Sequence, residues 1–359
     1  MSIHFHSLKI KEIKRETDQC VSVEFEIPEN LKETFRFTQG QSLTMRSFID
    51  QEEVRRTYSL CSSPLDNRWR VAIKKVDGGL FSTFANEKLK PGDLLEVMEP
   101  VGKFYVKLNP KNKKSYLAFA AGSGITPVIS IIKTTLQAEP HSSFTLVYGN
   151  RTRSSIIFFE ELEGLKNKFI DRFSLINILS RERTETPLNY GRIDFEKLNE
   201  LSKIINYNKI NETFICGPEE MIFLVKDYLQ QKGVHEKNIH FELFTTSTPG
   251  KSKVKSQKTN GEVGPKSSIT VKVDGRSFDF DLSLDSDTTI LDAALKQGAD
   301  LPFACKGGMC CTCKARLLEG DVEMDVHWGL EHEEVEKGYI LTCQSHPKTE
   351  KVVIDFDIK

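Results

Sequence analysis

The sequence predicts a multidomain α/β and β protein: an N-terminal antiparallel β-barrel, a central parallel α/β domain and a small C-terminal α+β module. Three observations predict it. The 359 residues exceed one ordinary core, the apolar pattern changes from short alternating strands to strands that alternate with helical stretches, and a polar segment without apolar periodicity precedes the last module. We place the domains at 1–108, 109–245 and 267–359, with a flexible linker at 246–266.

Composition and charge indicate where the protein is located and what kind of partner it binds. No apolar run is long enough to span a bilayer, and the N-terminus lacks the apolar region of a signal peptide, so we expect a cytoplasmic protein. Residues 268–359 carry a net charge of −8, which leaves +7 for 1–267. An acidic module suits electrostatic docking to a redox partner, although an ordinary solvated surface is the alternative.

The first 108 residues consist of short strands separated by turns. Turn signals such as Asp77-Gly78-Gly79 and Pro91-Gly92-Asp93 punctuate the chain. Apolar residues alternate or cluster in the runs 21–27, 42–45, 69–76 and 93–100. This pattern predicts an antiparallel barrel or sandwich.

Residues 115–244 alternate between apolar strands and amphipathic helical stretches. YLAFA is followed by PVISIIKTTLQ, and TFIC by PEEMIFLVKDYLQQKG, with two similar units between them. The last helix has Gly217-Pro218 at its start and Gly233 past its end. The alternation predicts βαβ units and a parallel sheet.

The last module begins with two alternating strands around the hairpin signal Asp274-Gly275. A short amphipathic helix follows and stops at Gly298. After a group of cysteines come a strand at KARLLEG, a charged helical turn at EHEEVEKG, and strands at YILTC and KVVIDFD.

Four of the eight cysteines fall within nine residues, 305–313, which is not the spread of a disulfide framework. Cys305, Cys310 and Cys313 have the spacing C-x₄-C-x₂-C, and Cys343 follows after 29 intervening residues. This is the spacing of a plant-type [2Fe–2S] site, in which four thiolates hold two irons. A Cys₄ zinc site is the alternative, although zinc ribbons usually have two short C-x₂-C knuckles.

The C-terminal module resembles plant-type ferredoxin domains, which have a β-grasp fold. The segments CKGGMCCTCKARLLEG and GYILTCQSHP are similar to those of the reductase subunits of phenylacetyl-CoA epoxidases, within the ferredoxin–NADP reductase superfamily. The resemblance covers the chain except for the linker. It implies that Cys305, Cys310, Cys313 and Cys343 are the ligands and that Cys311 is not.

In the barrel, Arg56-Thr57-Tyr58-Ser59 resembles the R-x-Y-S motif of the superfamily. The resemblance implies that Arg56 binds the FAD pyrophosphate, that Tyr58 packs on the isoalloxazine, and that Ser59 bonds near flavin N5. A guanidinium suits a diphosphate and an aromatic face suits a planar ring. The segment GGLFSTF looks like the phosphate loop of the family, to which Lys74 adds charge unless it is an ordinary exposed strand lysine. The residues expected in this loop are Gly79, Leu80, Phe81 and Ser82.

The first α/β strand runs into AAGSGITP, whose glycine turn brings the backbone close to a pyrophosphate at a helix N-terminus. Pro127 replaces the third glycine of G-x-G-x-x-G, and G-x-G-x-x-P is the form seen in the superfamily. The resemblance implies that Thr126 lies near the nicotinamide and that Cys216-Gly217-Pro218 is the second nicotinamide motif. The turn itself places Gly122 and Gly124 at the dinucleotide. A plain buried thiol is the alternative for Cys216.

Arginines, and no acidic residue, follow the second α/β strand. Arg151 stands directly after it, and Arg181 follows the third strand. A guanidinium suits the 2′-phosphate of NADPH, whereas NAD-binding sites present a carboxylate to the ribose 2′-OH. We therefore expect NADPH rather than NADH, with solvated loop arginines as the alternative.

Together the segments predict a NAD(P)H-dependent oxidoreductase with one electron path: from NAD(P)H to FAD, then to the [2Fe–2S] cluster, then to an oxygenase. Nicotinamide donates two electrons together and the cluster accepts one at a time, whereas flavin can transfer either one or two. Because the predicted path is electron transfer, no catalytic acid or base is expected. The resemblance implies a di-iron epoxidase of phenylacetate degradation as the acceptor, and Phe244 is a candidate cover for the flavin, or else a core residue.

Three alternatives remain open. The acceptor could be another oxygenase, Rieske-type or ferredoxin-dependent. The protein could instead be a redox-sensing module without turnover, or its last module a zinc-stabilised interaction domain. No nucleic-acid or membrane partner is expected.

Overall fold

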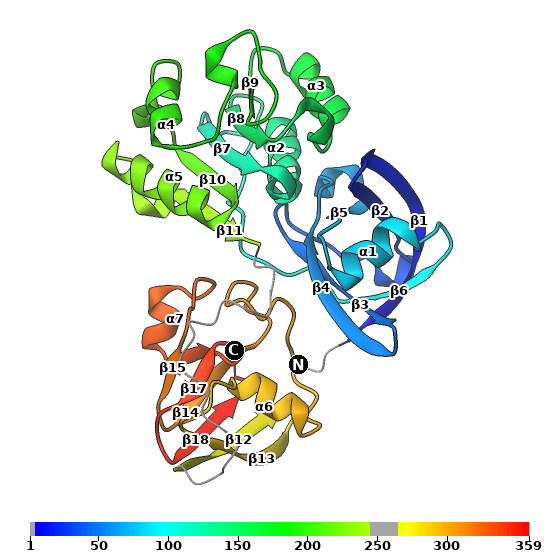
Figure 1. The fold of residues 1–359 in the computed structure, drawn as a ribbon, viewed down its shortest axis with the longest axis vertical. Helices are drawn as coiled ribbons and strands as arrows, with labels where there is room; N and C mark the ends of the chain where they lie inside the picture. The colour runs from blue at the N-terminus through cyan, green and yellow to red at the C-terminus, as the bar shows by residue number, and fades with distance from the viewer. Residues whose placement is uncertain (1–3, 245–264, 359) are drawn as a thin grey trace. The chain divides into compact units, whose positions relative to one another are not determined.

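The computed structural model describes residues 4–244 and 265–358 (Figure 1). These residues fall into two compact units. We call residues 5–244 the N-terminal body and residues 265–358 the C-terminal module. The predicted linker, 246–266, lies outside the described residues except for its last two. No helix among the described residues is long and apolar enough to cross a membrane.

The first part of the N-terminal body is a six-stranded antiparallel sheet in the order β4-β3-β6-β1-β2-β5. A bridge between Leu60, directly after β4, and Val71 of β5 joins the two edges, which closes the sheet as the predicted barrel. Buried side chains such as Leu8, Val23 and Phe35 fill its interior. The elements are β1 (His6–Thr17), β2 (Cys20–Glu26), β3 (Ser42–Ile49), β4 (Glu52–Ser59), β5 (Trp69–Lys74), α1 (Leu80–Glu87) and β6 (Leu94–Val97).

The second part is the predicted parallel sheet, with strand order β11-β10-β7-β8-β9. The chain builds outward from β7 to β9 and then returns to place β10 on the other side of β7. The sheet therefore has its topological switch point between β7 and β10. The elements are β7 (Ser115–Ala121), α2 (Ile125–Ala138), β8 (Ser143–Asn150), α3 (Phe159–Lys168), β9 (Phe173–Leu179), α4 (Phe195–Leu201), β10 (Glu212–Gly217), α5 (Glu219–Gln231) and β11 (Ile239–Leu243).

The barrel and the parallel sheet share buried contacts. Cys20, Cys61 and Phe104 from the barrel side belong to the same hydrophobic cluster as Ala118 of β7 and Ile129 of α2. This common core explains why the two predicted domains form one compact unit.

The C-terminal module has a five-stranded mixed sheet in the order β13-β12-β18-β14-β16, with β12 and β18 parallel. Helix α6 packs Ile290 and Leu291 into the core of the module. The predicted hairpin turn is present, since Asp274 and Gly275 both have positive φ. The elements are β12 (Lys266–Val273), β13 (Arg276–Ser283), α6 (Ile290–Lys296), β14 (Lys314–Glu319), β15 (Val322–Met324), α7 (His332–Glu336), β16 (Tyr339–Leu341), β17 (Ser345–Pro347) and β18 (Lys351–Asp355).

Candidate functional site

The two motifs predicted to bind nicotinamide meet at the switch point of the parallel sheet. β7 runs into the short 3₁₀ turn Gly122–Gly124, and Cys216 and Gly217 end the neighbouring strand β10. A Cβ atom at Gly124 would lie 2.1 Å from the carbonyl oxygen of Cys216, so only glycine fits there. Gly122 has φ +54°, which also favours glycine. Open α/β sheets bind ligands at such a point.

Two hydroxyl groups hold the glycine turn. Tyr148 is fully buried in β8, and its hydroxyl donates to the carbonyl oxygen of Gly122 at 2.9 Å. Thr126 Oγ1 donates to the carbonyl oxygen of Ser123 at 3.0 Å. Burial raises the pKa of Tyr148, so it stays protonated and remains a donor. Sequence reasoning missed Tyr148 because a tyrosine inside a buried strand belongs to no motif.

A polar cluster joins the barrel to the parallel sheet. Ser59, at the end of β4, donates to Glu242 Oε2 at 3.3 Å. Glu242 is the β11 residue paired with Cys216. Burial first, and then the carboxylate of Glu242, raise the pKa of the Cys216 thiol, which is therefore neutral. Sequence reasoning missed Glu242, whose place in HFELF is that of an ordinary polar strand residue.

The strand that carries the R-x-Y-S motif presents Arg56 and Tyr58 on one face. The ring of Tyr58 lies 5.7 Å from that of Phe81, at an angle of 33°. Burial raises the pKa of Tyr58, so the phenol is neutral. Arg56 is exposed, and its Nη1 donates to the carbonyl oxygen of Arg55.

Residues Gly79, Leu80, Phe81 and Ser82 form the start of helix α1. Gly79 is the N-cap and has no side chain to bond the N–H groups of the first turn, which suits an anion. Ser82 is buried, and its hydroxyl accepts from the Val76 N–H at 3.1 Å and donates to the Gly79 carbonyl at 3.2 Å. That hydroxyl therefore closes the loop on itself.

Lys74 and Phe244 are two further residues that the sequence predicted to lie near the cofactors. The Lys74 ammonium is 3.6 Å from the position that a Cβ atom would take at Gly122, so the structure brings this lysine to the dinucleotide turn. Phe244 follows β11 and is 40% exposed, which excludes a place in the core.

Arg151 and Arg181 lie side by side after the neighbouring strands β8 and β9. The N–H of Arg181 donates to the carbonyl oxygen of Arg151 at 2.8 Å, and both side chains are exposed. An acidic residue, Glu182, is present at the same edge, but its Oε2 accepts from the N–H of Arg153 at 2.7 Å. The exposed groups at this edge thus include two neighbouring guanidinium groups.

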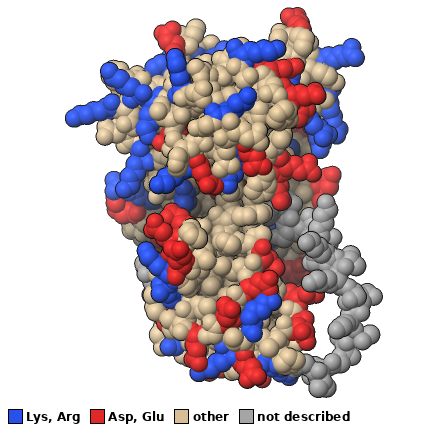
Figure 2. All heavy atoms as spheres, turned by 90° about the vertical axis from the view of Figure 1, so that its left-hand side faces the viewer, with Lys and Arg blue, Asp and Glu red and all other residues tan. Residues whose placement is uncertain are grey.

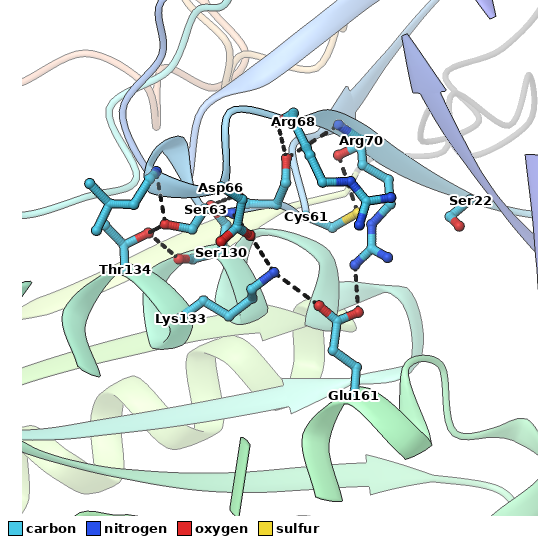
Figure 3. Close-up of polar contacts among 12 residues, drawn as sticks. Ser22, Cys61, Ser63, Asp66, Arg68, Arg70, Ser130, Lys133, Thr134 and Glu161 are labelled. Carbon is cyan, nitrogen blue, oxygen red and sulfur yellow. Dashed lines mark hydrogen bonds and ion pairs between the residues drawn. The ribbon is translucent and has the colours of Figure 1, made fainter. Parts of the chain in front are cut away.

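Ion pairs and hydroxyl contacts fix the barrel against helices α2 and α3 (Figure 3). Arg70 of β5 contacts Glu161 of α3 at 2.5 Å. Lys133 of α2 contacts both Glu161, at 3.1 Å, and Asp66 of the barrel, at 2.5 Å. Ser63 bonds Thr134 beside them at 2.9 Å. Burial alone would raise the pKa of Glu161, but Arg70 and Lys133 outweigh it and hold that pKa below its ordinary value.

The four predicted ligand cysteines lie in two pairs in the C-terminal module. The thiols of Cys305 and Cys310 lie close enough to influence each other's pKa, and so do those of Cys313 and Cys343. The N–H groups of Gly307 and Cys310 donate to Cys305 Sγ at 3.3 and 3.4 Å. The Cys310 thiol and then these N–H groups lower the pKa of Cys305 to about 5, against the opposing effect of burial. The thiolate is the form that binds metal.

This donor set fits a binuclear cluster. A [2Fe–2S] cluster takes two thiolates on each iron, which corresponds to two pairs.

The thiol of Cys311 makes its hydrogen bond outside the predicted ligand set. Its backbone has φ +56°, and its Sγ donates to the carbonyl oxygen of Gly329 at 2.9 Å. A Cβ atom at Gly329 would lie 2.6 Å from that sulfur. The contact supports the expectation that Cys311 is not a ligand.

Three family models match the chain. An oxidoreductase FAD-binding domain matches residues 7–105, an oxidoreductase NAD-binding domain matches 119–227, and a 2Fe-2S iron-sulfur cluster binding domain matches 271–348. The matches correspond to the barrel, the parallel α/β part and the C-terminal module.

Similar proteins cover the chain from end to end. It is 46% identical, over 99% of its length, to one of the subunits of 1,2-phenylacetyl-CoA epoxidase from Escherichia coli strain K12, and covers 98% of that protein. It is 32% identical, over 97% of its length, to the ferredoxin reductase component of 3-ketosteroid-9-alpha-monooxygenase of Rhodococcus rhodochrous, and covers 96% of it. The solved structure of phthalate dioxygenase reductase matches 98% of both chains with a TM-score of 0.60 and 25% identity.

Proposed function

The chain belongs to the family of oxygenase reductases that combine FAD-binding, NAD-binding and [2Fe–2S] domains, and we propose that it delivers electrons from NADPH to an epoxidase that acts on phenylacetyl-CoA. It is a NAD(P)H-dependent oxidoreductase. The observation that carries the choice of acceptor is the 46% identity, over 99% of the chain, to one component of such an epoxidase. FAD supplies the chemistry that connects a two-electron donor to a one-electron cluster.

In this proposal the barrel and the switch point hold the two nucleotides. Arg56 and the first-turn N–H groups of α1 bind the FAD diphosphate, and Tyr58 packs on the isoalloxazine. Ser59 and Cys216 both adjoin Glu242, so these three residues would lie beside the place where the two nucleotides meet. The Cys216 thiol is fully buried and neutral, so it would help to shape the nicotinamide site and would not act as a base.

The remaining residues divide between the dinucleotide and the cluster. Gly122, Gly124 and Thr126 take the NADPH pyrophosphate and nicotinamide, with Lys74 beside the turn. Cys305, Cys310, Cys313 and Cys343 hold the [2Fe–2S] cluster. A cytoplasmic location, where thiols stay reduced, remains a prediction.

The preference for NADPH rests on Arg151 and Arg181. We expect Arg181→Glu to lower kcat/KM with NADPH by about tenfold or more, because a charged hydrogen bond to the 2′-phosphate contributes about 1.5–3 kcal/mol. kcat/KM with NADH should change little. Lys209→Glu makes the same charge change at the amino-terminal edge of the sheet, before β10, and is the control. An unchanged ratio between the two nucleotides rules out this assignment.

An anaerobic titration of the purified protein with NADPH tests the function as a whole. Visible spectra should show flavin bleaching, and EPR spectra should show a reduced [2Fe–2S] signal. Bleaching without the EPR signal contradicts the electron path.

Reconstitution with candidate partners tests the acceptor. The reduced protein should support turnover of a phenylacetyl-CoA epoxidase faster than that of a 3-ketosteroid monooxygenase, whose reductase component is 32% identical to this chain. The reverse order would transfer the assignment to the other class of oxygenase.

A further inference from the structure

The amide of Gln344 spans the predicted cluster loop. Its Nε2 donates to the carbonyl oxygens of Lys306 and Cys343, both at 2.9 Å, and lies 3.8 Å from Cys343 Sγ. All three partners are acceptors, so the side-chain nitrogen, and not the oxygen, faces the loop. Cγ of Gln344 also lies 3.3 Å from the position that a Cβ atom would take at Gly308. Gln344 thus contacts both the cysteine that it follows and the distant loop.

The bond to Lys306 fixes the orientation of one peptide group. The carbonyl of Lys306 and the N–H of Gly307 belong to the same planar unit and point in opposite directions. That N–H donates to Cys305 Sγ at 3.3 Å. Holding the carbonyl therefore also directs the N–H at the sulfur of the predicted ligand.

This peptide needs an external contact to keep its orientation. Lys306 has φ +50°, a left-handed conformation that is unfavourable for a residue with a Cβ atom. Its side chain is tied separately, by an ion pair of 2.6 Å to Asp292. That ion pair is part-exposed and does not hold the backbone carbonyl. The hydrogen bond from Gln344 reaches the carbonyl oxygen itself and so fixes the peptide.

We propose that Gln344 is a positioning residue that holds the Lys306–Gly307 peptide with its N–H directed at Cys305 Sγ, and so raises the reduction potential of the [2Fe–2S] cluster. Reduction adds negative charge to the cluster and its sulfurs, so an N–H donor stabilises the reduced state more than the oxidised state. The inference rests on the proposed ligand set.

The test is a redox titration of the full-length protein, followed by EPR so that the flavin does not interfere. Gln344→Met has nearly the same length but no donor, and we expect it to lower the ratio of reduced to oxidised cluster at a fixed potential about tenfold. For a one-electron couple this is a downward shift of about 59 mV. Gln344→Lys keeps a donor and should stay near or above wild type. Gln297→Met, at an exposed position of the same module, is the matched control and should not shift.

An unshifted reduction potential in Gln344→Met would overturn the proposal. If Gln344→Met purifies without iron, normal loading of Gln344→Lys supports the proposal, whereas loss of iron from both overturns it. A wild-type protein without any [2Fe–2S] signal would instead contradict the proposed function, so the two failures are distinguishable.

Discussion

At the scale of single residues, Cys311 shows that position in a motif does not determine the role of a side chain. It lies between two predicted ligands in the sequence, yet its thiol donates to Gly329. The positive φ of Cys311 turns its side chain out of the direction that an extended backbone would give.

Cys311→Ser should therefore retain the cluster, because a hydroxyl can make the same bond to the Gly329 carbonyl. We expect the iron content and the EPR spectrum of wild type. Cys313→Ser is the matched control and should lose most of the iron. If Cys311→Ser loses iron as well, the proposed ligand register is wrong.

Gly124 is the second residue at which backbone geometry determines which side chain can be accommodated. Any side chain there meets the Cys216 carbonyl at 2.1 Å, so Gly124→Ala must displace the dinucleotide turn from β10. We expect KM for NADPH to rise at least tenfold with ferricyanide as acceptor, and stability to fall by about 1–3 kcal/mol, the usual cost of overpacking.

Gly164→Ala is the control for that change. Gly164 lies within α3, and nothing within 4 Å would meet its Cβ atom. It should stabilise the protein by about 0.5–1 kcal/mol and leave KM unchanged. Equal KM values in the two variants would show that the contact between the two motifs does not serve nucleotide binding.

At the scale of elements, the contacts of α2 and α3 with the barrel set the relative position of the two nucleotide sites. Glu161 is central because Arg70 and Lys133 both contact it. The pKa of its carboxyl lies below the ordinary 4.5, so its stabilisation is fully present above about pH 4.5 and is lost as the pH falls through the lower, folded-state value.

Glu161→Gln should lower the free energy of unfolding at pH 7 by about 2 kcal/mol, less than for a fully buried pair because the carboxylate is 24% exposed. The difference from wild type should shrink as the pH falls below 4.5, which urea unfolding at several pH values measures. Glu163→Gln, on the same helix, pairs only loosely with Lys166 at 3.9 Å and is the control. A difference that is independent of pH would contradict the role of this charge.

Helices, strands and turns were predicted correctly where the residues of the element itself carry the signal. The prediction was incomplete where an element depends on pairing with a strand that is distant in the sequence. The turn at Asp274-Gly275 was predicted because its residue types prefer positive φ. Strand β11 was not predicted from the sequence, because its five residues are ordered by parallel pairing with β10. The two three-residue strands β15 and β17 form their own two-stranded sheet, and among the described residues they pair with no other strand. For the same reason the glycine and cysteine motifs were found from the sequence, while Tyr148 and Glu242 became visible only through contacts between strands.

At the scale of the whole molecule, the flavin and cluster chemistry are assigned to separate compact units. The core of the C-terminal module consists of its own residues, among them Cys313 and Cys343. Loss of the cluster should therefore leave the N-terminal body folded.

Cys310→Ala tests this independence. We expect it to lose the cluster and the reduction of cytochrome c, while flavin reduction by NADPH in stopped flow keeps the wild-type rate within about twofold. A parallel loss of flavin reduction would mean that the two units do not fold independently. Cys20→Ala instead changes the core of the N-terminal body. The EPR signal of the cluster, which lies in the other unit, should be retained in this variant.

Net charge is unevenly distributed along the chain: residues 1–250 carry +3, residues 251–267 carry +4 and the C-terminal part is acidic. Figure 2 shows acidic and basic side chains over the visible surface, and the sequence gives −8 for residues 268–359 against +7 for the rest. If the acidic module docks on a basic patch of the oxygenase, electron delivery to that partner should slow several-fold between about 0.05 and 0.5 M salt, because the Debye length falls well below 10 Å. Reduction of ferricyanide, a small anion that needs no docking surface, is the control and should not slow in the same way. Equal salt responses for the two acceptors would mean that the negative charge serves solubility and not docking.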